Sequence, residues 1–455
     1  MKQFNKSLFI LILISFFLSS NAYAQEDDLQ EDDKNYDLEN EKKTSQYDSN
    51  NIEIVRIKKN YKIGDGITFS SKMSSLNITQ SVQLLSNIAT PDHYETFSSE
   101  YRIRRARMKF SGKTFDDKLY FRLRFDFAGN YQSNTTAKRS YNPVLQDAYL
   151  EYRPTSKQRI SLGLRADYVD TREIRMEGEV LGFIERSTIV DAFDAIFDYG
   201  LRYSATFRIH NKQLIKPYLS VTTGEGNTAL LQNFAGLKYG VRLDYLPFGN
   251  FSKAGEFYME DMVRERKPKL VVGAIYSYSD GISSVKGANG GRYIYGDSNK
   301  NKIYPDYIKY GIDYLFKYKG LYSMGSVVKT KAIIPNDIKG EFKLDGTFTT
   351  FTNQTSDQID SKVLTRLNLG CGYNVQVGYL LPSDISFGMR YSHLDQYQQS
   401  ANFATINNYY TLTTTKYFAS NSFKLQAEVS YQEYAVATSL ATGSYLAQIM
   451  LTFEL

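Results

Sequence analysis

Residues 119–127 read LYFRLRFDF, in which large apolar side chains alternate with polar or charged ones. Successive side chains of a β-strand point to opposite faces, so this stretch predicts a strand with one apolar and one polar face. Arg122, Arg124 and Asp126 share the polar face with Tyr120. A soluble sandwich also contains such strands, so the fold depends on how often the pattern recurs and on how the chain begins.

The alternation recurs as far as the last residue. It is clear in residues 105–110, 147–153, 160–165, 201–209, 237–245, 308–316, 385–391, 423–431 and 445–455. Segments of this kind, separated by turns, are typical of outer-membrane barrels, and we count roughly sixteen of them. We therefore predict an all-β fold: a transmembrane antiparallel β-barrel of about 16 strands within residues 61–455.

The composition agrees with this prediction. The chain is 42% hydrophobic and 23% charged, which suits a barrel whose lipid-facing residues alternate with lumen-facing polar ones. It has 38 Tyr and 28 Phe against only 9 Pro, so an aromatic belt can form without Trp. The single cysteine, Cys371, allows no internal disulfide, and the three histidines are too far apart for a metal-ligand spacing. We expect neither a metal nor another cofactor.

The N-terminus resembles a targeting signal. Lys2 and Lys6 precede an apolar run at residues 8–18, and Ala22-Tyr23-Ala24 is a cleavage signal, so residues 1–24 are read as a signal peptide. An uncleaved anchor is the alternative. Residues 25–60 begin with a strongly acidic stretch, and we expect a disordered periplasmic leader there. These assignments predict the outer membrane of a Gram-negative bacterium.

The connections between the predicted strands differ in length. Turn residues at 113–117, 154–156, 246–250, 319–320 and 382–384 predict short links, whereas residues 130–143, 280–306, 332–360 and 396–410 predict long loops. Short turns on one side and long loops on the other are typical of a barrel. Residues 168–199 carry both charges and follow an early strand, so we expect them to fold into the lumen.

Several short sequence motifs, taken in their order along the chain, resemble those of a known family. They are YRIRRAR (101–107), DFAG (126–129), QDAYLEY (146–152), FIERS (183–187), GYNVQVGY (372–379), MRYS (389–392) and NSFKLQ (421–426). In this order and spacing the chain resembles the phosphate-selective porin O and P family, especially its Bacteroidetes-type members, over residues 60–455. The resemblance implies a sixteen-stranded barrel, usually trimeric, that passes small anions such as phosphate or other oxyanions.

The polar faces of the strands supply candidate pore-lining cations. They are Arg105, Arg107, Lys109, Arg122, Arg124, Arg165, Arg202, Arg208, Arg242 and Arg390. In the inward loop the candidates for a constriction are Arg172, Arg175, Arg186 and Glu185. A surplus of cations raises the local anion concentration, and guanidinium binds oxyanions in two places. The alternative is that these arginines pair with lumen acids and only stiffen the wall.

These observations predict an outer-membrane porin for passive diffusion of small hydrophilic solutes, with a preference for anions. The expected partners are membrane lipid, small anions and two further copies of the chain, and no nucleic acid. A barrel that binds partners through its loops or its acidic leader is the alternative. A barrel enzyme is not expected, because none of His93, His210 and His393 has a recognisable nucleophile or acid partner.

Overall fold

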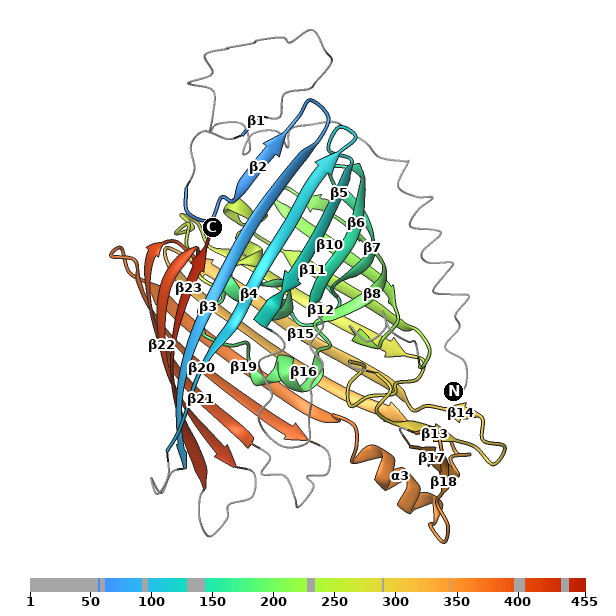
Figure 1. Ribbon diagram of the computed structural model, residues 1–455. Helices are drawn as coiled ribbons and strands as arrows, with labels where there is room; N and C mark the ends of the chain where they lie inside the picture. The colour runs from blue at the N-terminus through green and yellow to red at the C-terminus, as the bar shows by residue number, and fades with distance from the viewer. Residues whose placement is uncertain are drawn as a thin grey trace, which may run out of the picture. The chain divides into compact units, whose positions relative to one another are not determined.

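The structure is a computed structural model, shown in Figure 1. It describes residues 56–57, 62–91, 97–128, 144–226, 234–288, 290–343, 345–396, 406–434 and 442–455. The predicted signal peptide and most of the predicted acidic leader lie outside the described residues, as do His93 and the loop expected at residues 130–143.

Sixteen of the described strands form a closed ring in which each strand pairs antiparallel with the next. They are β3 (Ser75–Pro91), β4 (Ser98–Thr114), β5 (Leu119–Asp126), β6 (Leu145–Thr155), β7 (Gln158–Ala166), β8 (Phe197–Ala205), β10 (Gln213–Thr222), β11 (Lys238–Leu246), β12 (Lys269–Ser279), β15 (Asp306–Tyr318), β16 (Leu321–Ile333), β19 (Gly370–Leu380), β20 (Ile385–Gln396), β21 (Ile406–Ala419), β22 (Phe423–Tyr434) and β23 (Gly443–Glu454). The ring closes where β23 pairs with β3, with Phe453 opposite Val82. The predicted fold class and strand number are confirmed.

Burial along these strands is the reverse of that in a soluble protein. On β11, Val241 and Leu243 are 36% and 46% exposed, whereas Arg242 and Asp244 are fully buried. The apolar face of each strand therefore forms the outside of the ring, and the polar face forms its inside. Such an outer surface is stable only when lipid covers it, and closure leaves no unpaired strand edge in the hydrocarbon.

Two short strands extend the sheet next to the place where the ring closes between β23 and β3. β2 (Ile67–Ser70) pairs with residues 75–78 of β3, and β1 (Arg56–Ile57) pairs with β2. β23 pairs with residues 81–91 of β3, and Leu455 exchanges two backbone hydrogen bonds with Gln80, so β2 pairs with the part of β3 that β23 does not reach. This pairing satisfies backbone groups at an edge that would otherwise be open.

The two ends of the ring differ. Short links join consecutive strands at one end, with positive φ at positions such as Asp116, Asn211, Lys319 and Asp384. β9 (Phe207–His210) continues β8 at this end and also pairs with β10. The described long connections are at the other end and include the predicted regions near residues 280–306 and 332–360. This asymmetry is typical of membrane barrels.

One long connection lies at the short-link end and was not predicted. The expected turn at residues 246–250 is only the start of a segment that runs to residue 268 and contains the 3₁₀ helix η5 (Ser252–Phe257). Met259 of this segment donates its backbone N–H to the carbonyl oxygen of Val180 at 3.4 Å. The prediction of a short turn was incomplete because periodicity identifies where a strand ends but not where the chain then goes.

Two long connections build a small folded unit at the other end. β13 (Ile294–Gly296), β14 (Lys302–Ile303), β17 (Gly340–Phe342) and β18 (Phe348–Thr350) form a separate sheet, and α3 (Ser356–Leu364) begins with a capping box between Thr355 and Gln358. Tyr295, Ile359 and Val363 are buried in its core. Among the described helices, none is long and apolar enough to cross a membrane.

The inward segment, residues 167–196, joins β7 to β8 and lies within the ring (Figure 1). It contains η2 (Arg172–Arg175), η3 (Gly178–Val180) and α2 (Thr188–Phe193). Met176, Leu181 and Phe183 pack with inward-facing apolar residues of the wall, including Leu246 and Leu315, in a core inside the barrel. The inward segment therefore has its own hydrophobic attachment to one side of the lumen.

Candidate functional site

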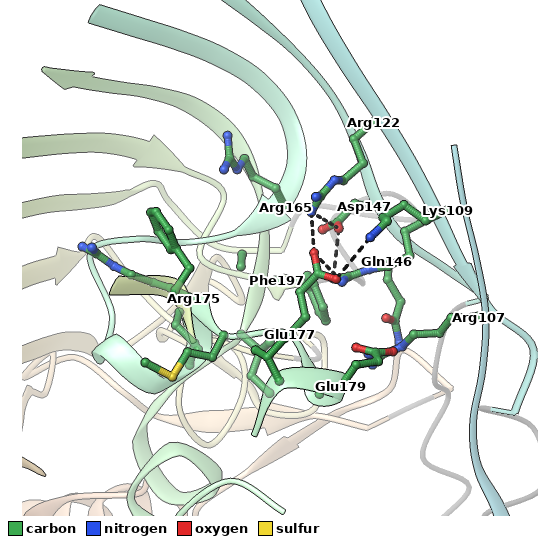
Figure 2. A pocket seen from close by; sticks show the side chains of 18 of the residues that line it. Arg107, Lys109, Arg122, Gln146, Asp147, Arg165, Arg175, Glu177, Glu179 and Phe197 are labelled. Carbon is green, nitrogen blue, oxygen red and sulfur yellow. Dashed lines mark hydrogen bonds and ion pairs between the residues drawn. The ribbon is translucent and has the colours of Figure 1, made fainter. Parts of the chain in front are cut away.

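A cavity of about 790 Å³ separates the inward segment from one side of the barrel wall (Figure 2). Residues of β4, β5, β6 and β7 line its outer side, and residues 174–180 line its inner side. It reaches Asp65, Ser422 and Glu454 at the short-link end and Lys286 at the other end. The cavity therefore extends along the barrel from one set of connections to the other.

The charged side chains that line the cavity are mostly cationic. Twelve are Lys or Arg: Arg104, Arg105, Arg107, Lys109, Arg122, Arg124, Arg153, Arg159, Arg165, Arg175, Arg186 and Lys286. Eight are acidic: Asp65, Asp126, Asp147, Glu151, Glu177, Glu179, Asp194 and Glu454. The lining thus carries an excess of four positive charges, which makes the potential in the cavity favourable for anions.

Strand register brings the wall cations together. Lys109 on β4 lies opposite Arg124 on β5, which in turn is opposite Asp147 on β6. Neighbouring strands are about 4.8 Å apart, so the two cations would repel each other without nearby acids. Arg124 Nη2 lies 2.9 Å from a carboxylate oxygen of Asp147, and Arg107 Nε lies 3.0 Å from Asp126. The wall acids thus neutralise the wall cations in part.

A β-bulge adds a cation that alternation does not predict. The pairing of β3 with β4 shifts register between Gln83 and Leu84, which leaves Arg104 as an extra residue on β4. Arg104 and Arg105 consequently both bind the carboxylate of Glu185, although strict alternation would place them on opposite faces. In the sequence, the only sign of this bulge was the adjacent pair Arg104 and Arg105 in a segment that otherwise alternates.

Two acids of the inward segment reach across the cavity to the wall (Figure 2). Glu177 accepts a hydrogen bond from Arg122 Nη1 at 2.8 Å and lies 3.6 Å from Lys109 Nζ. Glu179 accepts hydrogen bonds from Arg107 Nη1 at 3.1 and 3.2 Å. Carboxylates of the inward segment therefore face guanidinium groups of the wall across the cavity.

The cations of the wall favour the ionised form of both carboxylates. Burial alone would raise the pKa of Glu177, but the positive charges of Lys109 and Arg122 outweigh burial and hold this pKa well below its usual value. Burial opposes ionisation of Glu179 in the same way, yet the charge of Arg107 lowers its pKa to about 2. Each acid thus keeps its negative charge at neutral pH and cancels part of the wall charge.

A second group of charges, with almost no exposed side-chain surface, attaches the inward segment to β11 and β15 of the wall, and of its members only Arg175 also borders the cavity. This Arg–Asp cluster consists of Arg172, Arg175, Arg242, Asp244 and Asp313. Asp244 accepts hydrogen bonds from the three guanidinium groups at 2.7–2.9 Å, and Asp313 accepts from two of them. Since three cations meet two anions without solvent, the cluster holds the segment in place and leaves these arginines few free donors.

The structure separates the predicted site residues into two groups. Those that line the cavity are Arg105, Arg107, Lys109, Arg122, Arg124, Arg165, Arg175 and Arg186, and those that do not are Arg172, Arg202, Arg208, Arg242, Arg390 and Glu185. A role of this second group in the pore stays a prediction, because its members do not line this cavity. The inward segment covers Arg390, which lies over the Phe183 ring, and Arg208 is exposed at the end of β9.

Four lining cations were not among the predicted residues: Arg104, Arg153, Arg159 and Lys286. Arg153 and Arg159 flank a short link, where alternation ends, and Lys286 lies in a long connection that has no periodic pattern. In the part of the chain that the structure describes, no group of three or more His, Cys, Asp or Glu side chains could hold a metal ion.

Residues 77–267 match the model of the phosphate-selective porin O and P family. The match includes β4 to β8, the inward segment and every wall strand that lines the cavity's outer side. The predicted resemblance to this porin family is confirmed over that stretch.

No curated protein matches the chain. Among solved structures, an anion-selective porin from Comamonas acidovorans is similar, with 9% identity, a TM-score of 0.49 and coverage of 84% of this chain and 100% of that one. OprB from Pseudomonas putida has 9% identity, a TM-score of 0.47 and coverage of 84% and 94%. OmpT from Vibrio cholerae, in a trimer form, has 9% identity, a TM-score of 0.46 and coverage of 84% and 100%. The fold assignment rests on the strand pairing of this chain.

Proposed function

We propose that this protein is an outer-membrane porin that lets small hydrophilic solutes diffuse passively and favours anions. The observation that carries the proposal is the cavity, which extends along a closed barrel and has four more cationic than acidic side chains in its lining. The exposed apolar outer wall supports insertion in lipid. The match to the porin family supports the same function.

The wall cations would act by attracting anions and replacing part of their hydration. A narrow cavity with low-dielectric walls concentrates the field of its charges, so an excess of cations raises the anion concentration inside. Guanidinium groups stay charged at every relevant pH and offer paired N–H donors to an oxyanion. Phosphate and other oxyanions are therefore suitable solutes, and a homotrimer is the assembly that we propose.

Conductance in planar lipid bilayers tests this function. We expect ion-conducting steps from the purified protein and, under a salt gradient, a reversal potential displaced toward the chloride equilibrium potential. The double substitution Arg122→Gln and Arg124→Gln should reduce this displacement. Arg366→Gln, which removes a cation from the loop unit at Glu341, should not. Absence of conductance, or a displacement toward the potassium potential, would refute the proposal.

One observation favours a second role as a binding platform. The unit formed by β13, β14, β17, β18 and α3 has its own hydrophobic core and its own four-stranded sheet. Under this alternative, partner proteins bind this unit or the acidic residues 25–50. Deleting residues 25–50 should leave conductance unchanged in a porin and should abolish partner binding in a platform that uses the leader.

A further inference from the structure

Glu177 occupies the centre of a group of three wall cations. Its carboxylate lies 2.8 Å from Arg122 Nη1, 3.6 Å from Lys109 Nζ and 3.7 Å from Arg124 Nη1. These cations come from two paired strands of the wall, whereas Glu177 comes from the inward segment on the other side of the cavity (Figure 2). The side chain therefore places a negative charge where a passing anion would bind most strongly.

The carboxylate does not satisfy the donors that surround it. Only its contact with Arg122 is short enough for a hydrogen bond, since the other two nitrogens lie beyond 3.5 Å. Arg124 Nε is buried and has no hydrogen-bond partner. A planar carboxylate has two oxygens, whereas a tetrahedral oxyanion has four that point in different directions. The arrangement of donors thus suits a tetrahedral oxyanion better than it suits Glu177.

The local charge points to a divalent ligand. Lys109, Arg122 and Arg124 contribute three positive charges, and the acids that contact them are Glu177 and Asp147. With Glu177 in place, one positive charge remains in excess. When the Glu177 carboxylate moves away, two remain, which balance one divalent oxyanion. A monovalent anion would leave the site partly uncompensated.

Glu177 can leave the site without a movement of the inward segment. Its side chain is 30% exposed toward the cavity, whereas that of Glu179 is 5% exposed. Glu177 is the residue that precedes η3, and its side chain makes no capping hydrogen bond there. The Arg–Asp cluster and the apolar packing of Met176 hold the backbone before Glu177, and the apolar packing of Leu181 holds it after Glu177. A change of rotamer is thus sufficient to vacate the site.

We propose that Glu177 is a tethered carboxylate that occupies an oxyanion-binding site formed by Lys109, Arg122 and Arg124, and that a divalent tetrahedral oxyanion displaces it. This inference rests on the proposed porin function. Glu177 weakens binding by competing with the permeating anion, which prevents the anion from being held too tightly to leave. It also favours divalent over monovalent anions, because only a divalent ligand replaces the charge of the carboxylate and satisfies the remaining donors.

Inhibition of chloride current by sulfate tests the proposal. Sulfate is a tetrahedral divalent anion, and nitrate serves as the planar monovalent reference. In Glu177→Gln the competing charge is gone, so we expect the sulfate concentration for half-inhibition to fall about tenfold or more, with a much smaller change for nitrate. Glu177→Asp keeps the charge and should remain close to the wild type.

Glu341→Gln is the matched control, because it removes one negative charge from the loop unit, away from the cavity. It should leave sulfate inhibition unchanged. Equal sulfate inhibition in the wild type and in Glu177→Gln, with normal chloride conductance and anion preference in both, would overturn the proposal for Glu177 alone. Absence of anion preference in the wild type would instead refute the porin function on which it rests.

Discussion

Substitution of Asp244 by Asn should release the inward segment from the wall. Asp244 accepts hydrogen bonds from Arg172 Nη2 at 2.9 Å, Arg175 Nη1 at 2.8 Å and Arg242 Nε at 2.7 Å. Asparagine has nearly the same shape but no charge, so Arg172 and Arg242 would keep only Asp313, and Arg175 would lose its carboxylate partner. The variant tests whether this cluster, more than the apolar core, keeps the segment on its side of the lumen.

The expected magnitude follows from burial. Asp244, Arg172 and Arg175 have no exposed side-chain surface, so solvent cannot replace the lost charge. Breaking one partner of a buried ion pair costs about 3–5 kcal/mol. Because 1.4 kcal/mol is a factor of ten, the attached state would lose stability by roughly a hundredfold to several thousandfold. The segment would then spend measurable time away from the wall.

Single-channel recording measures this change directly. In Asp244→Asn we expect a noisier open channel with a shifted mean conductance, together with a lower thermal unfolding midpoint. Asp147→Asn is the matched control, because Asp147 pairs with wall residues Arg122 and Arg124 and not with the inward segment. It should lower stability without adding channel noise. Wild-type conductance, noise and melting in Asp244→Asn would show that the cluster does not hold the segment.

Two further predictions concern the outer wall and a loop. Leu412 is 63% exposed on β21. Leu412→Arg should therefore oppose membrane insertion by about 2–4 kcal/mol and reduce the folded yield in lipid vesicles, whereas Leu412→Met should not. Equal yields for the two variants would argue against a lipid-facing wall here. Glu225, which accepts a hydrogen bond from Ser283 Oγ at 2.8 Å, has its pKa raised from 4.5 to about 7 by burial. The folded state then holds a proton that the unfolded state releases, so stability should fall as pH rises from about 4.5 to 7, and Glu225→Gln should lack this contribution in pH-dependent melting curves. Identical pH profiles for the two proteins would contradict this account.

Much of the architecture followed from local pattern. An alternation such as that of residues 119–127 makes one face compatible with lipid and the other with water, and only a closed ring pairs all the backbone groups of such strands. The expectation of about sixteen strands depended only on counting these segments. The inward segment was recognisable because a long charged stretch interrupts the pattern directly after β7.

The contacts inside the barrel did not follow from that pattern. Alternation placed Arg122 and Arg242 on equivalent inner faces, but Arg122 borders the cavity and Arg242 is sealed beneath the inward segment. Arg172 and Asp313 are 141 residues apart and bind each other only because the segment folds back across the lumen. The extra inward cation at Arg104 comes from a shift in register against β3.

The period of two is a property of each strand, so it was enough to predict a closed barrel with an apolar outside and a cationic inside. Which cations remain open to the cavity and which are neutralised could not be predicted in this way. That outcome depends on where the inward segment and residues 247–268 pack within the ring, and hence on contacts between residues far apart in the chain. Glu177 shows the difference best, because its charge is visible in the sequence but its position among three wall cations is not.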